Sequence, residues 1–169
     1  LGDTLVVRHA KEEEKLVTLD SQERELSCDD IVIANNSDAI GLAGVMGGLD
    51  TEIENTTKNV LIEAAIFDSV RVRKTSKKIV RSEASNRFEK GLDANRTYMA
   101  MERAVKLLEA YADATIQTGT VVYDNTNKEP KNIDIKVADI NALLGTDISL
   151  EETLNVFKKL AFETAVSGD

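Results

Sequence analysis

The sequence has very little of the residues that build disulfides, zinc sites or membrane spans. Cys28 is the only cysteine and His9 the only histidine among 169 residues. An internal disulfide is therefore excluded, and a multi-cysteine zinc site would have no ligands. No apolar run approaches the roughly 20 residues that span a bilayer. The opening LGDTLVVRHA also lacks the basic start and apolar middle of a signal peptide. We therefore expect a soluble cytoplasmic protein without a metal centre.

Neither Cys28 nor His9 is a strong candidate for catalysis. His9 lies on a strand pattern with nothing that marks it as a base, and Cys28 is interpreted as a buried or incidental thiol. The chain opens without methionine and directly on a strand pattern, so we expect it to be a piece of a longer protein.

The charge is acidic overall but unevenly placed. A net charge of −9 argues against a protein that grips nucleic acid over its whole surface. The basic segment, residues 71–90, nevertheless has eight basic and two acidic side chains, which gives +6 and leaves −15 for the remainder. This segment could hold RNA locally, or it could be the solvated face of a helix.

The first half of the chain has the short apolar runs of β structure. Residues 5–8 and 16–19 flank the charged stretch KEEEK, which predicts a hairpin. Residues 59–65, NVLIEAA, are almost wholly apolar, so we expect a strand buried on both faces. Further strands are expected at residues 31–34 and 40–45.

Helical patterns follow. Residues 67–79 form a basic helix candidate, and residues 95–112 form a stronger one. Five residues of the second helix recur at a spacing of three or four, which predicts an apolar face packed in the core. They are Tyr98, Met101, Val105, Leu108 and Ala112.

The chain is expected to divide near residue 130. A strand candidate at 120–124 is followed by the polar stretch DNTNKEPKN, which contains the only proline and marks a linker. The domains are therefore placed at 1–128 and 129–169. The second has a strand pattern from Ile133, a short helix that ends at Gly145, and a helix opened by Ser149 with Glu152 in a capping box. A helix-turn-helix and an ordinary helical hairpin both fit this pattern.

Three elements could carry chemistry. The glycine loop, residues 44–48 (GVMGG), could present N–H groups to a carboxylate, phosphate or ester carbonyl, or be a tight turn. Glu63 is the one charge in an apolar run, which suggests a polar cavity, although a solvated carboxylate or a pair with Arg71 or Arg73 fits equally. Residues 81–93, RSEASNRFEKGLD, read alone as a loop and a helical turn.

Taken in this order, the three elements resemble the editing domain of the phenylalanyl-tRNA synthetase β subunit family. The resemblance rests on GVMGG, NVLIEAAIFD and RSEASNRFEKGLD, followed by RTYMAMERAVKLL. It continues into IDIKVADINALLGTDISLEETLNVFKKLAF, which is similar to the next module of that subunit. The implied fold is α+β, a mixed and largely antiparallel sheet with packed helices, and then a partial helix-turn-helix-like module. Residues 1–128 would lack the start of the editing domain, and 129–169 the end of the next module.

The resemblance implies hydrolysis of tyrosine wrongly attached to the phenylalanine tRNA. An apolar pocket rejects an isostere that adds one hydroxyl by only about a hundredfold, so accuracy needs a second site. In the family a glutamate receives the tyrosine hydroxyl, and the match falls on Glu63. The small residues that leave room for the ring fall on Gly47 and Ala84. Ser82 stands where relatives often have threonine, and would position the water or the terminal ribose. No catalytic base is assigned.

The resemblance also implies partners. These are the phenylalanine tRNA and an α subunit in an (αβ)₂ assembly, where the α subunit would use ATP and Mg²⁺. The chain itself would hold no cofactor and no metal, and neither DNA nor membrane is expected as a partner. Five residues are tRNA-contact candidates: Arg73, Lys74, Lys77, Lys78 and Arg81.

One departure limits the expected activity. The family's pocket also uses a histidine and an arginine from a segment upstream of residue 1, so the fragment alone should be a weak or inactive editor. Two rival functions stay open: a noncatalytic domain that docks or scaffolds tRNA, and a free-standing trans-editing deacylase.

Overall fold

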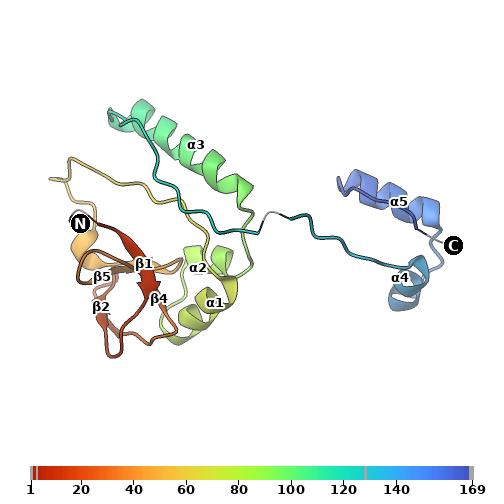
Figure 1. Cartoon of the computed structure of the whole chain (residues 1–169), viewed down its shortest axis with the longest axis horizontal. Helices are drawn as coiled ribbons and strands as arrows, with labels where there is room; N and C mark the ends of the chain where they lie inside the picture. The colour runs from red at the N-terminus through yellow and green to blue at the C-terminus, as the bar shows by residue number, and fades with distance from the viewer. Residues whose placement is uncertain (1, 3, 128, 168–169) are drawn as a thin grey trace. The chain divides into compact units, whose positions relative to one another are not determined.

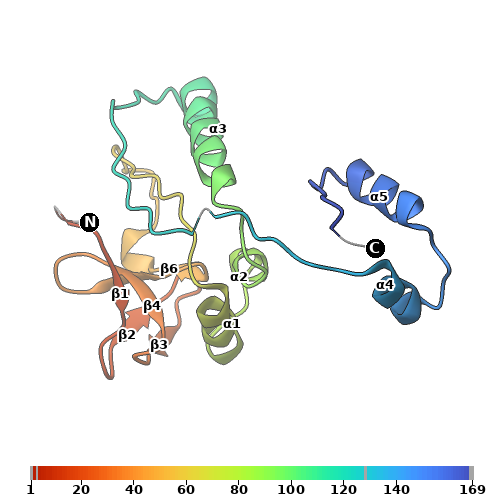
Figure 2. The same cartoon turned by 45° about the vertical axis from the view of Figure 1, so that its right-hand side comes forward.

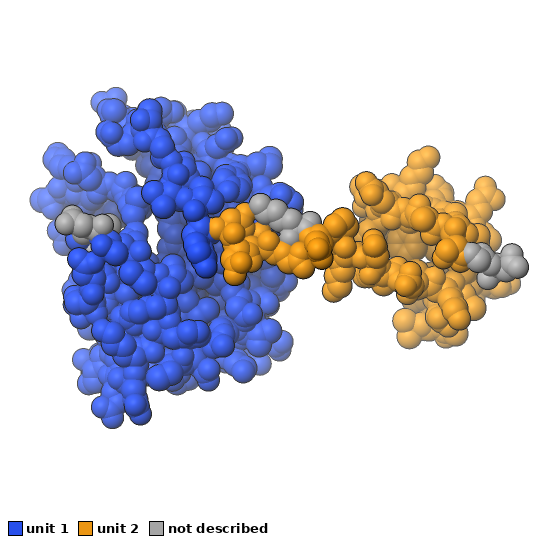
Figure 3. Space-filling model, in the orientation of Figure 1, with its two compact units in different colours: residues 1–123 blue, residues 124–169 orange. Residues whose placement is uncertain are grey.

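The chain forms two compact units, which Figure 3 shows in different colours. The computed structural model describes residues 2, 4–127 and 129–167. The first unit is residues 1–123 and the second is residues 124–169. The first combines antiparallel sheets with helices, so the expected α+β class is confirmed.

A four-stranded antiparallel sheet is the centre of the first unit (Figure 1). Its spatial order is β1 (Val6–His9), β4 (Ile31–Ala34), β5 (Ala39–Leu42) and β6 (Met46–Gly47). The β4–β5 turn is held by Asn35, whose side-chain oxygen accepts hydrogen bonds from the backbone N–H groups of Ser37 and Asp38 at 3.0 and 2.8 Å. This is the turn chemistry that asparagine favours.

The predicted hairpin between the first two apolar runs is wrong. β1 pairs with β4, while β2 (Lys15–Val17) pairs with β3 (Glu23–Glu25) in a separate two-stranded sheet. Because β3 reads ERE, its side chains give no apolar signal, and the sequence pattern missed the strand that takes β2 as its partner.

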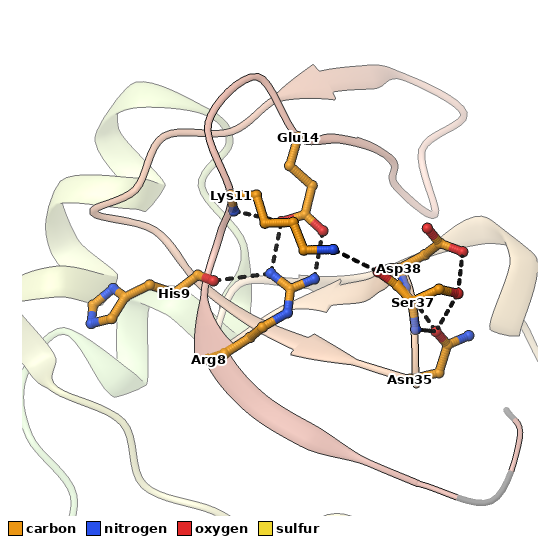
Figure 4. Close-up of polar contacts among 7 residues, drawn as sticks. All are labelled: Arg8, His9, Lys11, Glu14, Asn35, Ser37 and Asp38. Atoms are coloured by element: carbon orange, nitrogen blue, oxygen red, sulfur yellow. Dashed lines mark hydrogen bonds and ion pairs between the residues drawn. The ribbon is translucent and has the colours of Figure 1, made fainter.

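An ion pair ties edge strand β1 to the turn that follows it (Figure 4). Arg8 donates two hydrogen bonds to the Glu14 carboxylate, at 2.6 and 2.8 Å, and the Lys11 backbone N–H donates a third at 2.8 Å. The Arg8 hydrogen bonds are the main reason that the pKa of Glu14 falls to about 2.

The core lies where two helices pack against the four-stranded sheet. α1 (Ser69–Lys78) buries Val72 in the same cluster as Val32, Leu42 and Val45. α2 (Glu83–Phe88) contacts α1, and its Phe88 packs on that cluster. Both helices lie beside the sheet in Figures 1 and 2. The predicted basic helix at residues 67–79 is thus confirmed.

The third helix has the predicted bounds but not the predicted burial. α3 (Asn95–Ala112) begins and ends as its periodicity indicates, yet it contains no buried residue. Tyr98 on its apolar stripe is 46% exposed, and Ala112 is exposed too. Its placement in the core is therefore wrong for the described residues, because amphipathicity predicts a helix but not the surface that covers its apolar face.

Three strand predictions fail in the same way. Residues 59–65, residues 120–124 and the run that begins at Ile133 are in no strand. Val60 and Leu61 are exposed, so the first of these runs is not buried on both faces. An apolar run becomes a strand only where another strand supplies hydrogen-bond partners, and no described strand pairs with these runs.

The second unit contains two helices with the predicted ends. α4 (Val137–Leu144) is followed by Gly145 in the left-handed conformation, and α5 (Leu150–Lys159) follows Ser149. Ser149 and Glu152 form the predicted capping box, with the Ser149 N–H donating to the Glu152 carboxylate at 2.9 Å. In the part of the chain that the structure describes, none of the helices has the length and apolar character to cross a membrane.

Candidate functional site

The glycine loop leaves β5 and passes through β6 to the short 3₁₀ helix η1 (Leu49–Thr51). Gly44 has φ of +68°, and a Cβ there would lie 3.0 Å from the Phe88 ring. A Cβ on Gly48 would lie 2.6 Å from the Ile40 carbonyl oxygen, closer than two such atoms can approach. The loop therefore needs glycine at both positions, one for its conformation and one for its close contact.

Ser82 joins the glycine loop to α2. Its hydroxyl donates to the Val45 carbonyl oxygen at 2.6 Å and accepts a hydrogen bond from the Ser85 backbone N–H at 3.1 Å. In return the Ser85 hydroxyl accepts from the Ser82 N–H at 2.9 Å, which completes a capping box. The structure thus brings together two of the three elements that the sequence singled out.

Glu63 lies between the glycine loop and α1 in the sequence, on a segment without regular structure. The residue is exposed, and its carboxylate makes no hydrogen bond or ion pair to any described residue. Protein atoms nevertheless surround the carboxyl closely enough for desolvation to raise its pKa above the ordinary value. The pair with Arg71 or Arg73, one of the alternatives that the sequence left open, is not formed among the described residues. The Glu63 carboxylate therefore accepts no hydrogen bond from the described residues and could accept one from a ligand.

The two small candidate residues are both exposed. Gly47 is in β6, and a Cβ there would meet only the end of the Leu19 side chain, at 3.3 Å. Ala84 lies in the first turn of α2, two residues after Ser82. Ser82 is hydrogen-bonded to Val45 and Ser85. Gly47 lies two residues after Val45, and Ala84 directly precedes Ser85. Glu63 forms no hydrogen bond with Gly47 or Ala84.

Five of the eight cations of the basic segment lie on α1, and the other three, Arg81, Arg87 and Lys90, follow it in the chain. Val72, Thr75 and Ser76 face inward and are buried. All five tRNA-contact candidates are exposed. Lys78 approaches Asp30 at 3.6 Å and Arg81 approaches Glu89 at 4.0 Å, but Arg73, Lys74 and Lys77 form no ion pair with a described residue. The excess of basic over acidic side chains in residues 71–90 is the signal that the sequence gave for these cations.

Asp30 is a buried carboxylate that sequence reasoning missed. It accepts hydrogen bonds from the Thr75 hydroxyl at 2.6 Å and from the Ser27 backbone N–H at 2.9 Å. Burial by itself raises the pKa of Asp30, but Thr75, Ser27 and Lys78 together lower it below the ordinary value. Because its partners come from α1 and the β3–β4 loop, this acid fixes α1 in place and is not available to a ligand.

Cys28 and His9 gain no functional partner. Both are exposed, so Cys28 is not a buried thiol. Within the described residues, no cluster of histidine, cysteine and acidic side chains could hold a metal ion. A shallow hollow at the start of α1 is lined by Asp68, Arg71 and Lys74, with Asp29 and Val70. None of the four pocket candidates, Gly47, Glu63, Ser82 and Ala84, lies in its wall.

Comparison with known proteins identifies the class of domain. Residues 1–113 match the family model described as the B3/4 domain, so the chain belongs to the B3/4 domain family. These residues contain the sheet, the glycine loop, α1, α2 and α3. The expected resemblance is thereby confirmed at the level of the domain.

The chain is also similar to one particular kind of protein over nearly all its length. It is 45% identical over 166 residues to the phenylalanine–tRNA ligase beta subunit of Bacillus subtilis (strain 168), covering 98% of this chain and 21% of that subunit. The corresponding subunit of Streptococcus thermophilus (strain CNRZ 1066) is 42% identical, with 98% of this chain and 20% of the subunit covered. The chain thus spans about a fifth of the length of the curated relatives it matches.

Proposed function

We propose that this chain is part of a phenylalanine–tRNA ligase β subunit and serves the hydrolysis of tyrosine mischarged onto the phenylalanine tRNA. That the chain is part of such a subunit is supported by its 45% identity to a relative over 98% of its length. The similarity includes the second unit, which favours a piece of the ligase over a free-standing trans-editing deacylase. The B3/4 domain occupies the part of the chain that contains Glu63 and the glycine loop.

Glu63 would recognise the tyrosine hydroxyl. A desolvated carboxylate without a partner gains a hydrogen bond from a phenol O–H, whereas phenylalanine offers no donor and leaves the carboxylate unpaired. The two esters therefore differ in binding in the direction that editing requires. A hydrogen bond to a charged acceptor contributes about 1.5–3 kcal/mol, which corresponds to roughly a 10- to 150-fold preference for tyrosine.

Gly47 and Ala84 would give the aromatic ring its space. Both are exposed and neither has a side chain beyond Cβ, so a ring can approach the backbone at these positions. No described residue is assigned as general base. The role of this site is then to bind and orient the ester, with water as the attacking group.

The test is deacylation by the intact ligase, with its α and β subunits. Glu63→Ala should reduce the rate for tyrosyl-tRNA about 10-fold or more, and change the rate for phenylalanyl-tRNA little. Glu52→Ala is the matched control, because Glu52 is an exposed glutamate on the same connecting segment and its side chain has no partner. Equal tyrosyl rates for Glu63→Ala and wild type would remove Glu63 from the site.

In the same proposal the whole ligase binds the phenylalanine tRNA and forms an (αβ)₂ assembly with its α subunit. ATP and Mg²⁺ would act in that assembly through the α subunit, where aminoacylation takes place. In this proposal the contribution of this chain is to the editing step.

A second candidate function is tRNA docking by the outer face of α1. The specific observation is that Arg73, Lys74 and Lys77 are exposed and form no ion pair with a described residue. Such cations can neutralise phosphates, and each phosphate contact adds to the salt dependence of binding. Docking and editing are compatible, because they use different residues of the same domain.

Charge reversal separates the two functions. Lys74→Glu with Lys77→Glu should weaken tRNA binding and reduce the salt dependence of the binding constant. Hydrolysis of a small tyrosyl ester should persist, since no pocket candidate is changed. Lys158→Glu with Lys159→Glu in α5 makes the same change in net charge and serves as the control. Equal tRNA affinity of the two double variants would eliminate the docking role of α1.

A further inference from the structure

The Ser82 hydroxyl already donates one hydrogen bond and accepts another within the chain. A hydroxyl has one hydrogen to donate, and that hydrogen is directed at the Val45 carbonyl at 2.6 Å. One of its lone pairs accepts the Ser85 N–H at 3.1 Å. To donate to a water or a ribose hydroxyl, Ser82 would have to break the shorter of these two bonds.

The residues around this hydroxyl are buried and hydrogen-bonded. Val45 is buried, and its own N–H donates to the Leu42 carbonyl at 3.0 Å. Ser85 is 1% exposed and completes the capping box on the other side. Next to Val45, Gly44 packs against the Phe88 ring of α2. The glycine loop and the start of α2 are therefore in contact over several residues, and Ser82 supplies the polar link between them.

We infer that Ser82 is a positioning residue: its hydrogen bond to the Val45 carbonyl fixes the glycine loop against the start of α2. This differs from the direct handling of water or ribose that the family resemblance implies for Ser82. Gly47 follows Val45 by two residues and Ala84 follows Ser82 by two, so the link sets the distance between the two small residues. The effect on editing rests on the function proposed above, but the link itself does not.

Three substitutions at residue 82 separate the link from the helix cap. Ser82→Thr retains an acceptor for the Ser85 N–H and a donor for the Val45 carbonyl. Ser82→Asp retains a good N-cap acceptor but has no hydrogen to donate. Ser82→Ala has neither. As a control, Ser85→Ala removes one side chain of the capping box and leaves the Ser82–Val45 bond in place.

Amide hydrogen exchange of the 169-residue chain tests the link without any activity. The N–H groups of Val45 and Gly48 are protected by hydrogen bonds to Leu42 and Ile40. With Ser82→Ala and Ser82→Asp, their exchange should become roughly tenfold faster, while that of the core residue Val32 stays unchanged. Ser82→Thr and Ser85→Ala should exchange as wild type does at these two sites. Wild-type exchange of Val45 and Gly48 in Ser82→Asp would overturn the inference.

Deacylation of tyrosyl-tRNA by the ligase gives the second measurement. Ser82→Ala and Ser82→Asp should lower kcat about 10-fold or more with a smaller change in KM, and Ser82→Thr should restore kcat. If Ser82→Asp retained the full kcat although its loop exchanges faster, the positioning role in editing would be lost. If wild type did not hydrolyse the ester at all, the proposed function would fail, and the exchange result would still decide whether the link exists.

Discussion

Replacing Glu14 with glutamine should destabilise the first unit in a way that depends on pH. The ordinary pKa of glutamate is 4.5, and the Arg8 hydrogen bonds lower that of Glu14 to about 2. A difference of about 2.5 in pKa corresponds to ~3.4 kcal/mol of stability at neutral pH, at about 1.36 kcal/mol for each pH unit. Because the Arg8 side chain is 23% exposed, solvent screening reduces this to about 1–2 kcal/mol.

The pH dependence follows from the direction of this pKa change. A carboxyl whose pKa is lowered by folding stabilises the folded state fully above its unfolded pKa, here 4.5. The contribution is then lost as pH falls through 4.5 toward the folded pKa of about 2. At about pH 2.5 only roughly a quarter of it remains. The difference in stability between wild type and Glu14→Gln should therefore shrink over this interval.

The measurement is urea unfolding followed by NMR, with the amide signal of the buried residue Val32 as the probe. This signal reports the sheet that β1 joins, because Val32 lies opposite Arg8 in that sheet, within the first unit. Glu12→Gln is the control, since Glu12 is an exposed neighbour whose side chain has no partner. A stability difference that stays constant from pH 6 to about pH 2.5, or one that Glu12→Gln reproduces, would refute the reasoning.

Four further substitutions have outcomes that the structure specifies. Asp30→Asn should cost about 1–3 kcal/mol at pH 7 in the same urea assay, and the loss should fade as pH falls below 3.8, the ordinary pKa of aspartate. Gly48→Ala should cost about 2–4 kcal/mol because its Cβ meets the Ile40 carbonyl, whereas Gly47→Ala meets only a movable Leu19 side chain and should cost under about 1 kcal/mol. Glu63→Gln should stabilise the chain at pH 7, and the gain should vanish as pH falls toward 4.5, since desolvation raises the pKa of this carboxyl in the folded state. A fall in stability at pH 7 would show that Glu63 has a partner.

The elements that could be predicted from sequence are those determined by neighbouring residues. α3 begins and ends where its periodicity indicates, and the Ser149 cap and Gly145 terminus bound α5 and α4 as expected. These features depend on hydrogen bonds within a few residues, which local sequence specifies. The strand at residues 31–34 was predictable for a related reason, because its apolar side chains lie between the turn-forming residues on either side.

Features that need a distant partner could not be predicted in this way. β2 takes the polar strand β3 as its partner, and the Ser82–Val45 bond joins residues 37 positions apart. In the candidate site, the glycine loop was recognisable from its composition alone, although the contacts that require Gly44 and Gly48, with Phe88 and Ile40, appear only in the fold. The carbonyl of Val45 carries no sequence signal, since every residue has one, and only the fold shows that it faces Ser82.

The directions of the pKa changes separate Glu63 from the acids that hold the fold together. Folding lowers the pKa of Glu14 and Asp30 because hydrogen-bond donors of this chain hold their charged forms. Among the described acids with a resolved change, Glu63 is the one whose pKa rises, with desolvation as the cause and no donor to offset it. A raised pKa means that the charged form of Glu63 lowers stability at neutral pH, in contrast to Glu14 and Asp30. In the proposed editing site a tyrosine hydroxyl would supply a donor and should lower the pKa of Glu63 on binding, whereas phenylalanine would leave it raised.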